Sequence, residues 1–436
     1  ALKRYRRAIR YVTQTQSPGL MSWPFAGAVV VLGVACGLGG AGFTLLLSLV
    51  EQAAFGFTTG TVAEAATQAQ ALRRFLVVVS AGCLVAVAWW ALRKYGPKIP
   101  SVTDAARGKN MPPGWTVADT VLQVVNVGAG GSIGREGAPR QFGAMAAGFG
   151  SRFFGLSPEQ RLALVACGAG AGLAGIYNVP LGGAFFAVEC VWGLTRLKDG
   201  LARVAVMTLA ALATSYLATA VAWIAVPDRP IYPIPAWEAD YATMAFALVC
   251  GPLFGLAGFG FGRLFDVLAR IAPKGNAILW TMPLSYLALA CIAIPLPLVL
   301  GNGHALSLQV FAQNVSLDAA VLLVIAKPVA TFLTVGSGAT GGKLTPSLST
   351  GTVLGVVLAA AWGTLWPVSP IGAAVVGAAA MLAAAIAAPF TAFVLLVEFT
   401  ASQAASWPAI ALAIFGATLT AHFMSRALPA SGDTTH

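Results

Sequence analysis

Two short glycine-rich stretches of this chain carry charged side chains in sequence that is otherwise mostly apolar. Residues 131–139 read GSIGREGAP and place Arg135 and Glu136 between glycines, and residues 341–346 read GGKLTP. A glycine-rich turn that leads into a helix exposes backbone N–H groups without intrahelical partners, at the positive end of the helix dipole. Helix N-termini of this kind bind anions. We therefore expect the two stretches to be helix N-termini that point at one shared anion.

Glu136 is a carboxylate in the place where that anion would lie. When ionised it would occupy the anion site, and when protonated it would leave the site. This interpretation predicts that Glu136 is a gate. Two plainer interpretations are that Glu136 pairs with Arg135 or that it caps its own helix.

The elements that hold these stretches lie in a membrane. The 436-residue chain is 58% hydrophobic and only 9% charged, with a mean hydropathy of +0.80, whereas about 25% of residues in a soluble domain are charged. Residues 23–50, 75–92 and 204–226 form apolar runs that approach or exceed the roughly 20 residues of a spanning helix. Glu136 is therefore an intramembrane acid, which is a functional candidate by default.

Other apolar runs are interrupted by glycine or proline and are shorter: residues 161–177, 181–194, 351–366 and 371–388. Broken helices are tolerated in a membrane only where the freed backbone is buried or lines a polar cavity. The pattern is typical of a transporter or a channel.

The basic residues predict orientation. The N-terminal LKRYRRAIR carries five basic residues and no acid, which places it in the cytoplasm by the positive-inside rule. The segment after the second span is also basic, so the chain returns to the same side. Topology and anionic lipid explain the net charge of +11 without nucleic acid as a partner. We expect a multi-pass protein of a bacterial inner membrane.

Several function classes are excluded or disfavoured. The six cysteines are isolated, without the spacing of a metal site or a disulfide framework, so no metal or cofactor is predicted. No HExxH or GxSxG pattern appears, and an enzyme is not expected. A secondary carrier of organic substrates stays as a more distant alternative, because it could share broken helices, although acids are scarce in the apolar runs. No signal peptide and no domain after the last span are expected.

An internal repeat organises the chain. Pro180 lies nine residues before Glu189, and Pro389 lies nine residues before Glu398. Upstream, Pro139 and Pro346 precede these prolines by 41 and 43 residues. We predict an all-α membrane protein with two inverted repeats, 21–228 and 229–428, between a basic segment 1–20 and a short tail 429–436.

Together these motifs resemble the CLC family of chloride channels and transporters over about residues 22–428. GREGAP resembles the family's G-K/R-E-G-P, the GGKLTP region its G-x-F-x-P, GPKIP at 96–100 its G-S-G-I-P, and the two proline-to-glutamate segments its paired helices. The resemblance implies the CLC fold, a homodimer with one anion pathway in each subunit, and Glu136 as the outer gate. The implied anion-binding residues are Gly96, Pro97, Lys98, Gly134, Arg135, Gly137, Gly342, Lys343 and Leu344.

Pro97 and Lys98 depart from the family pattern. Pro97 stands where the family has its anion-binding serine, as in plant members that prefer nitrate, and proline donates no hydrogen bond. A chloride ion would lose a ligand there, so chloride is the expected anion with a preference for nitrate as a possibility. Lys98 could add a point charge or snorkel to water. Lys343 could likewise add charge to the pathway or face an aqueous vestibule.

Two further departures concern protons. Proton-coupled members carry an inner acid directly after the position of Glu189, where this chain has Cys190, and a thiol with a reference pKa of about 8.5 is a poor proton relay. The inner-gate tyrosine of the family falls near Ala430. We therefore predict anion movement that is uncoupled or weakly coupled to protons, with stoichiometric anion/proton antiport as the alternative.

Overall fold

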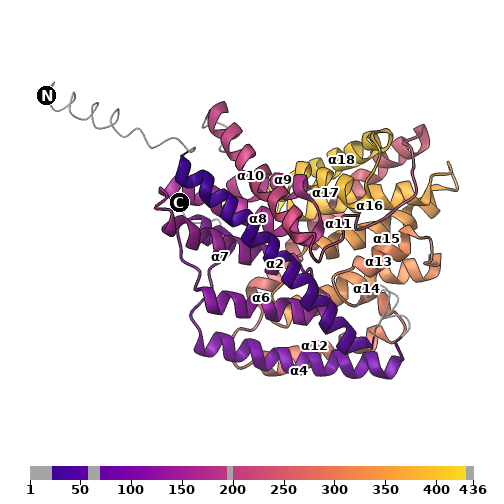
Figure 1. The fold of residues 1–436 in the computed structure, drawn as a ribbon. Coiled ribbons are helices and arrows are strands. Elements are labelled where there is room, and N and C mark those ends of the chain that lie inside the picture. The colour runs from indigo at the N-terminus through magenta and orange to yellow at the C-terminus, as the bar shows by residue number, and fades with distance from the viewer. Residues whose placement is uncertain (1–21, 57–68, 194–199, 429–436) are drawn as a thin grey trace.

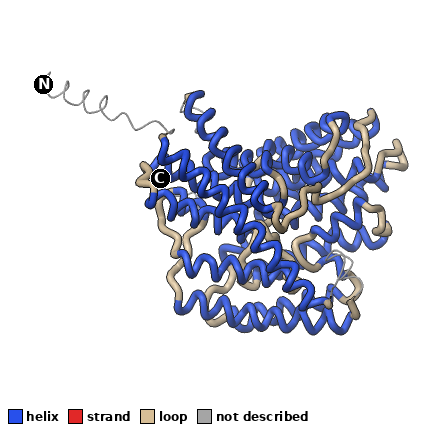
Figure 2. Tube along the Cα trace, in the orientation of Figure 1, coloured by secondary structure: helices blue, strands red, loops and turns tan. Residues whose placement is uncertain are grey.

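The computed structural model describes residues 22–56, 69–193 and 200–428, and in these ranges regular structure is helical (Figures 1 and 2). The α-helices of the N-terminal part are α2 (Trp23–Phe55), α4 (Ala71–Tyr95), α5 (Val102–Ala106), α6 (Pro113–Gly128), α7 (Gly137–Phe153), α8 (Pro158–Tyr177), α9 (Pro180–Phe186) and α10 (Leu201–Ala222). The α-helices of the C-terminal part are α11 (Tyr241–Ile271), α12 (Ile278–Ala293), α13 (His304–Phe311), α14 (Leu317–Gly336), α15 (Leu344–Trp362), α16 (Pro370–Ile386), α17 (Pro389–Thr400) and α18 (Trp407–Ala427).

Seven helices within the described ranges are long and apolar enough to cross a membrane, judged by length and composition. Between them lie short or irregular helices: α9 has 7 residues and continues as a π-helix over Ala187–Gly193, and α13 has 8 residues. The predicted short run at 351–366 differs, because its helix already begins at Leu344 and reaches 19 residues. Apolar side chains such as Leu45, Leu84 and Leu253 remain exposed on the outer helices, as expected for surfaces that face lipid.

Two runs of three helices follow the same order in the two parts of the chain: α7–α8–α9 and α15–α16–α17. In each run the first two helices touch through glycines, since a Cβ on Gly143 or Gly168 would collide with the other residue's backbone, and the same holds for Gly351 and Gly377. Small residues let membrane helices approach closely. The similar packing agrees with the predicted repeat, whose exact limits stay a prediction.

Helices α9 and α17 each have their N-terminus capped by a glutamate from the other segment. Glu189, in the π-helix after α9, accepts hydrogen bonds from the backbone N–H groups of Phe390 and Thr391 at the start of α17, at 3.3 and 2.6 Å. Glu398 in α17 accepts from Leu181 and Gly182 at the start of α9, at 2.9 and 2.6 Å. Each glutamate thus satisfies orphan N–H groups of the opposite helix. Both proline-to-glutamate segments are explained by this exchange.

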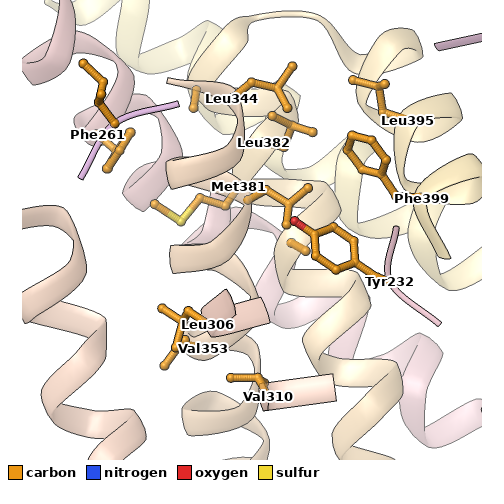
Figure 3. Packing of buried hydrophobic residues seen from close by; sticks show 14 of the residues in the cluster. Tyr232, Phe261, Leu306, Val310, Leu344, Val353, Met381, Leu382, Leu395 and Phe399 are labelled. Carbon is orange, nitrogen blue, oxygen red and sulfur yellow. The ribbon is translucent and has the colours of Figure 1, made fainter. Parts of the chain in front are cut away.

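Helices α8 and α16, rich in alanine and glycine, are buried along nearly their whole length. A cluster of larger apolar side chains lies beside α15 and α17, and Figure 3 shows Tyr232 and Phe399 with their rings close together, at a centroid distance of 5.8 Å. Leu344, the first residue of α15, belongs to the same cluster. The start of α15 is therefore anchored in the packed interior.

Candidate functional site

The two glycine-rich stretches meet. Gly134 and Gly342 exchange backbone hydrogen bonds of 2.8 and 2.9 Å and form an isolated antiparallel bridge. Helix α7 begins at Gly137 and α15 begins at Leu344, so the prediction that both stretches lead into helix N-termini is confirmed. The bridge holds the two N-termini side by side, which is the arrangement that a shared anion would need.

The Glu136 carboxylate lies at the start of α15. One of its oxygens, Oε1, accepts a hydrogen bond from the backbone N–H of Leu344 at 2.7 Å, and Oε2 accepts from the Thr345 hydroxyl at 3.0 Å. The Glu136 side chain is 0% exposed. A Cβ on Gly134 or Gly342 would collide with Oε1, so only glycine leaves room for the carboxylate. A negative group here is stabilised by the α15 dipole and by otherwise unpaired N–H groups.

Neither of the plainer interpretations of Glu136 describes its contacts. Glu136 is the N-cap residue of α7, yet its side chain makes no capping hydrogen bond to that helix. Among the described residues no ion pair joins it to Arg135. The Arg135 guanidinium instead lies over the ring of Tyr177, 4.8 Å from its centroid.

The Arg135 side chain lines a small cavity. This cavity of about 160 Å³ is also lined by Glu51, Asn302 and His304. Tyr177, at the end of α8, links Arg135 to Glu136. Its ring lies under the Arg135 guanidinium, and its hydroxyl donates to Glu136 Oε2 at 3.3 Å.

The stretch before Glu136 is held by a buried lysine. Lys327 on α14 is 0% exposed and donates from Nζ to the Ser132 hydroxyl at 2.9 Å and to the carbonyls of Val299 and Gly301 at 2.9 and 2.8 Å. The Ser132 N–H is bound by Thr334 at 3.2 Å. These contacts fix the turn from which Glu136 projects.

A larger cavity of about 710 Å³ is lined by residues that include Pro97, Lys98, Gly137 and Gly341. The cavity thus ends one residue from Glu136 and one from Gly342. Gly96 is not among the residues that line this cavity. It is the C-cap residue of α4, and a Cβ there would collide with the Trp115 ring. The structure therefore brings Pro97, Lys98 and Gly137 to one cavity, whose lining includes neither Gly96 nor Arg135.

Lys343 is paired. Its ammonium lies 2.7 Å from a carboxylate oxygen of Asp266 on α11, a partner that the sequence did not suggest. Leu344 contributes its backbone N–H, as expected, and its side chain is buried in the core. Of the two alternatives for Lys343, the ion pair favours a place at a hydrated vestibule, since both partners are partly exposed.

Cys190 lies in the π-helix and is exposed in the single chain. Its neighbour Glu189 is engaged at the start of α17, where the Thr391 hydroxyl adds a hydrogen bond of 2.6 Å. The predicted inner-gate position Ala430 lies outside the described residues.

Several residues of the site were missed from the sequence. Thr345 and Tyr177 lie within motifs that were recognised, but nothing in their spacing indicated that they donate to Glu136. Asp119 is a buried acid in a chain whose apolar runs were expected to contain few acids, and Lys327 is a buried cation that the sequence analysis did not single out; they are 6% and 0% exposed. Lone charges in otherwise apolar helices were the available signal.

The chain matches the family model described as "Voltage gated chloride channel" over residues 84–422. It is 29% identical over 371 residues to the H(+)/Cl(-) exchange transporter ClcA of Cronobacter sakazakii, which covers 80% of this chain and 77% of that protein. It is 27% identical over 387 residues to the voltage-gated ClC-type chloride channel ClcB of Citrobacter koseri, with 85% and 89% covered.

Solved structures share the fold. The structure of a slow cyanobacterial Cl-/H+ antiporter superposes with a TM-score of 0.78 at 24% identity, covering 93% of this chain and 95% of that one. A CLC-type fluoride/proton antiporter superposes with a TM-score of 0.71 at 22% identity, covering 91% and 94%. The predicted all-α architecture of inverted, broken helices is thereby confirmed.

Proposed function

Because this chain belongs to the voltage gated chloride channel family, we propose that it carries small inorganic anions, chloride first, along a pathway that Glu136 closes. The observation that carries this proposal is the position of the Glu136 carboxylate on the Leu344 N–H and the Thr345 hydroxyl. A bound anion would need the same donors, so anion and carboxylate compete for one place. Protonation removes the charge that holds Glu136 there, and the anion can then enter.

The charge of the larger cavity supports anion entry. Its lining includes the cationic side chains of Arg93, Lys98, Arg140 and Lys274. A cleft lined by one sign of charge raises the local concentration of the opposite ion. By the predicted orientation this cavity opens to the cytoplasm, and the small cavity lined by Arg135 faces outward.

Coupling to protons is proposed to be weak. The relatives include a protein named as an exchanger and one named as a channel, so both modes occur at similar identity. Residue 190 is a cysteine and supplies no carboxylate. The Glu189 carboxylate already accepts hydrogen bonds from backbone N–H groups at the start of α17. A stoichiometric antiporter remains the second candidate, favoured by the exchanger's name. A homodimer in a bacterial inner membrane follows from the family resemblance.

Liposome flux tests the proposal. Purified protein in liposomes should release chloride much faster than protein-free liposomes, and it should leave a trapped amino acid or sugar inside. Rapid release of the organic solute without chloride would instead indicate a carrier of organic substrates.

A further inference from the structure

The larger cavity contains a carboxylate that anion transport alone does not explain. Asp119 on α6 is the only acid among the described residues that line the cavity, and it is 6% exposed. The charged groups that share this lining are all cations: Arg93 from α4, Arg140 from α7, and Lys98 and Lys274 from connecting segments. Helix α2, which also packs against α6, contributes no residue to the lining. A negative side chain here works against an anion pathway.

Neutral donors hold the Asp119 carboxylate. Oδ1 accepts from the Trp89 indole N–H at 2.9 Å, and Oδ2 accepts from the side-chain amides of Gln123 and Gln141 at 3.0 and 3.1 Å. No described cation lies within ion-pair distance of Asp119. The Arg93 guanidinium donates elsewhere, to Gly338 O and to the Thr340 hydroxyl. Asp119 is thus fixed in position without being neutralised by an ion pair, and it faces the cavity.

Gln123 extends from Asp119 toward Glu136. Gln123 is 1% exposed, and its Oε1 is a buried acceptor with no donor among the described residues. A Cβ on Gly137 would lie 2.5 Å from this oxygen, so the oxygen sits against the residue that directly follows Glu136. A buried acceptor without a partner is costly. A water molecule or a protonated carboxyl would satisfy it.

We propose that Asp119, reached past Gln123, is the cavity-side proton acceptor that serves Glu136 in this chain. The inference rests on the proposed function, because it assumes that Glu136 must lose a proton to return to the anion site. The O–H bond of protonated Glu136 breaks, the proton passes through water at Gln123 Oε1, and an O–H bond forms on Asp119. Asp119 then releases the proton to the cavity. Glu136 is left ionised, and no other reactant is needed.

This route does not use position 190. An intermediate carboxylate lowers the barrier for moving a proton through a buried region, because it accepts the charge at a prepared place. Asp119 provides that place in the wall of the larger cavity, whereas Cys190 lies beside a glutamate whose carboxylate is already hydrogen-bonded to the start of α17. Whatever proton movement accompanies the anion would pass through Asp119.

The test is the ratio of proton to chloride movement in liposomes under a chloride gradient, recorded at the same time with a pH electrode and a chloride electrode. The wild type should move protons uphill, slowly relative to chloride. Asp119→Asn should lower the proton-to-chloride ratio at least tenfold, Asp119→Glu should retain most of it, and Gln123→Leu should lower it. Asp104→Asn is the matched control: Asp104 is a partly exposed carboxylate outside the cavity lining, and the hydrogen bond from Lys109 holds its pKa below the usual range.

The ratio separates a proton acceptor from a structural residue. If Asp119 only supports Trp89 and the two glutamines, Asp119→Asn will lower both fluxes together and leave the ratio unchanged, which overturns the inference. A wild type that moves chloride without any uphill proton movement also overturns it, while the proposed anion function stands. Absence of chloride movement would instead refute the proposed function.

Discussion

Glu136 Oε1 lies 2.7 Å from the backbone nitrogen of Leu344, a residue 208 positions later in the chain. The Glu136 carboxylate projects from the start of α7 and caps the N-terminus of α15. This contact joins the two glycine-rich stretches through a side chain as well as through the backbone bridge between Gly134 and Gly342.

Thr345→Val should raise anion flux at neutral pH. The substitution removes the hydroxyl that donates to Glu136 Oε2 but keeps a similar shape, so the ionised carboxylate is held less tightly. A hydrogen bond to a charged group contributes about 1.5 kcal/mol, which corresponds to a roughly tenfold larger open population. Chloride flux from liposomes is the measurement, and Thr364→Val, at an exposed threonine bonded to Ala361 O, is the control. A slower flux in Thr345→Val than in the wild type would count against the gate.

Lys327→Met should destabilise the fold. The methionine would leave the carbonyls of Val299 and Gly301 buried without their donor and would release Ser132. One such loss costs roughly 1–3 kcal/mol, so we expect a clearly lower melting temperature in detergent. Lys274→Met, in a connecting segment that lines the cavity, serves as the comparison and should melt like the wild type. Equal melting of the Lys327 variant and the wild type would contradict the support that we assign to Lys327.

Pro97→Ser tests anion preference. Pro97 lines the cavity beside Lys98 and offers no donor, so a serine hydroxyl would add a ligand that favours chloride. The nitrate-to-chloride flux ratio should fall relative to the wild type. Identical ratios in both proteins would shift attention to the charge of Lys98, which Lys98→Met would then test.

Cys190→Glu should not create a strict antiporter by itself. The new carboxylate would stand beside Glu189, which is engaged with α17, and the position that the family resemblance assigns to the inner-gate tyrosine is Ala430. The proton-to-chloride ratio in liposomes is expected to stay well below a fixed stoichiometry. A variant that pumps protons at a fixed ratio would show that position 190 alone limits coupling.

The sequence predicted the helical membrane fold because hydropathy and interrupted apolar runs are local properties. It also predicted that GREGAP and GGKLTP start helices, because glycine placement marks helix starts. It placed Glu136 at the anion site shared by the two stretches but left capping of α7 open as an alternative, because the choice between α15 and α7 depends on how the two stretches pair. Nor did it reveal that Glu189 and Glu398 exchange helix caps, although their equal spacing from proline showed that they were equivalent.

Charged partners were the least predictable part. The pairing of Lys343 with Asp266, and the enclosure of Lys327 and Asp119 by neutral groups, depend on contacts between helices that are far apart in the chain. A single polar residue in an apolar run indicates a buried interaction, but it does not identify the partner.

Anion flux as a function of pH, measured in liposomes for the wild type and for Glu136→Gln, tests the central claim most directly. Glutamine keeps the size of the side chain and removes the charge that competes with the anion for the Leu344 N–H and the Thr345 hydroxyl. We predict that wild-type flux rises as the pH falls and that Glu136→Gln is open at every pH with a flat profile. A Glu136→Gln profile that follows the wild type would contradict the account, because the pH dependence would then arise from another group.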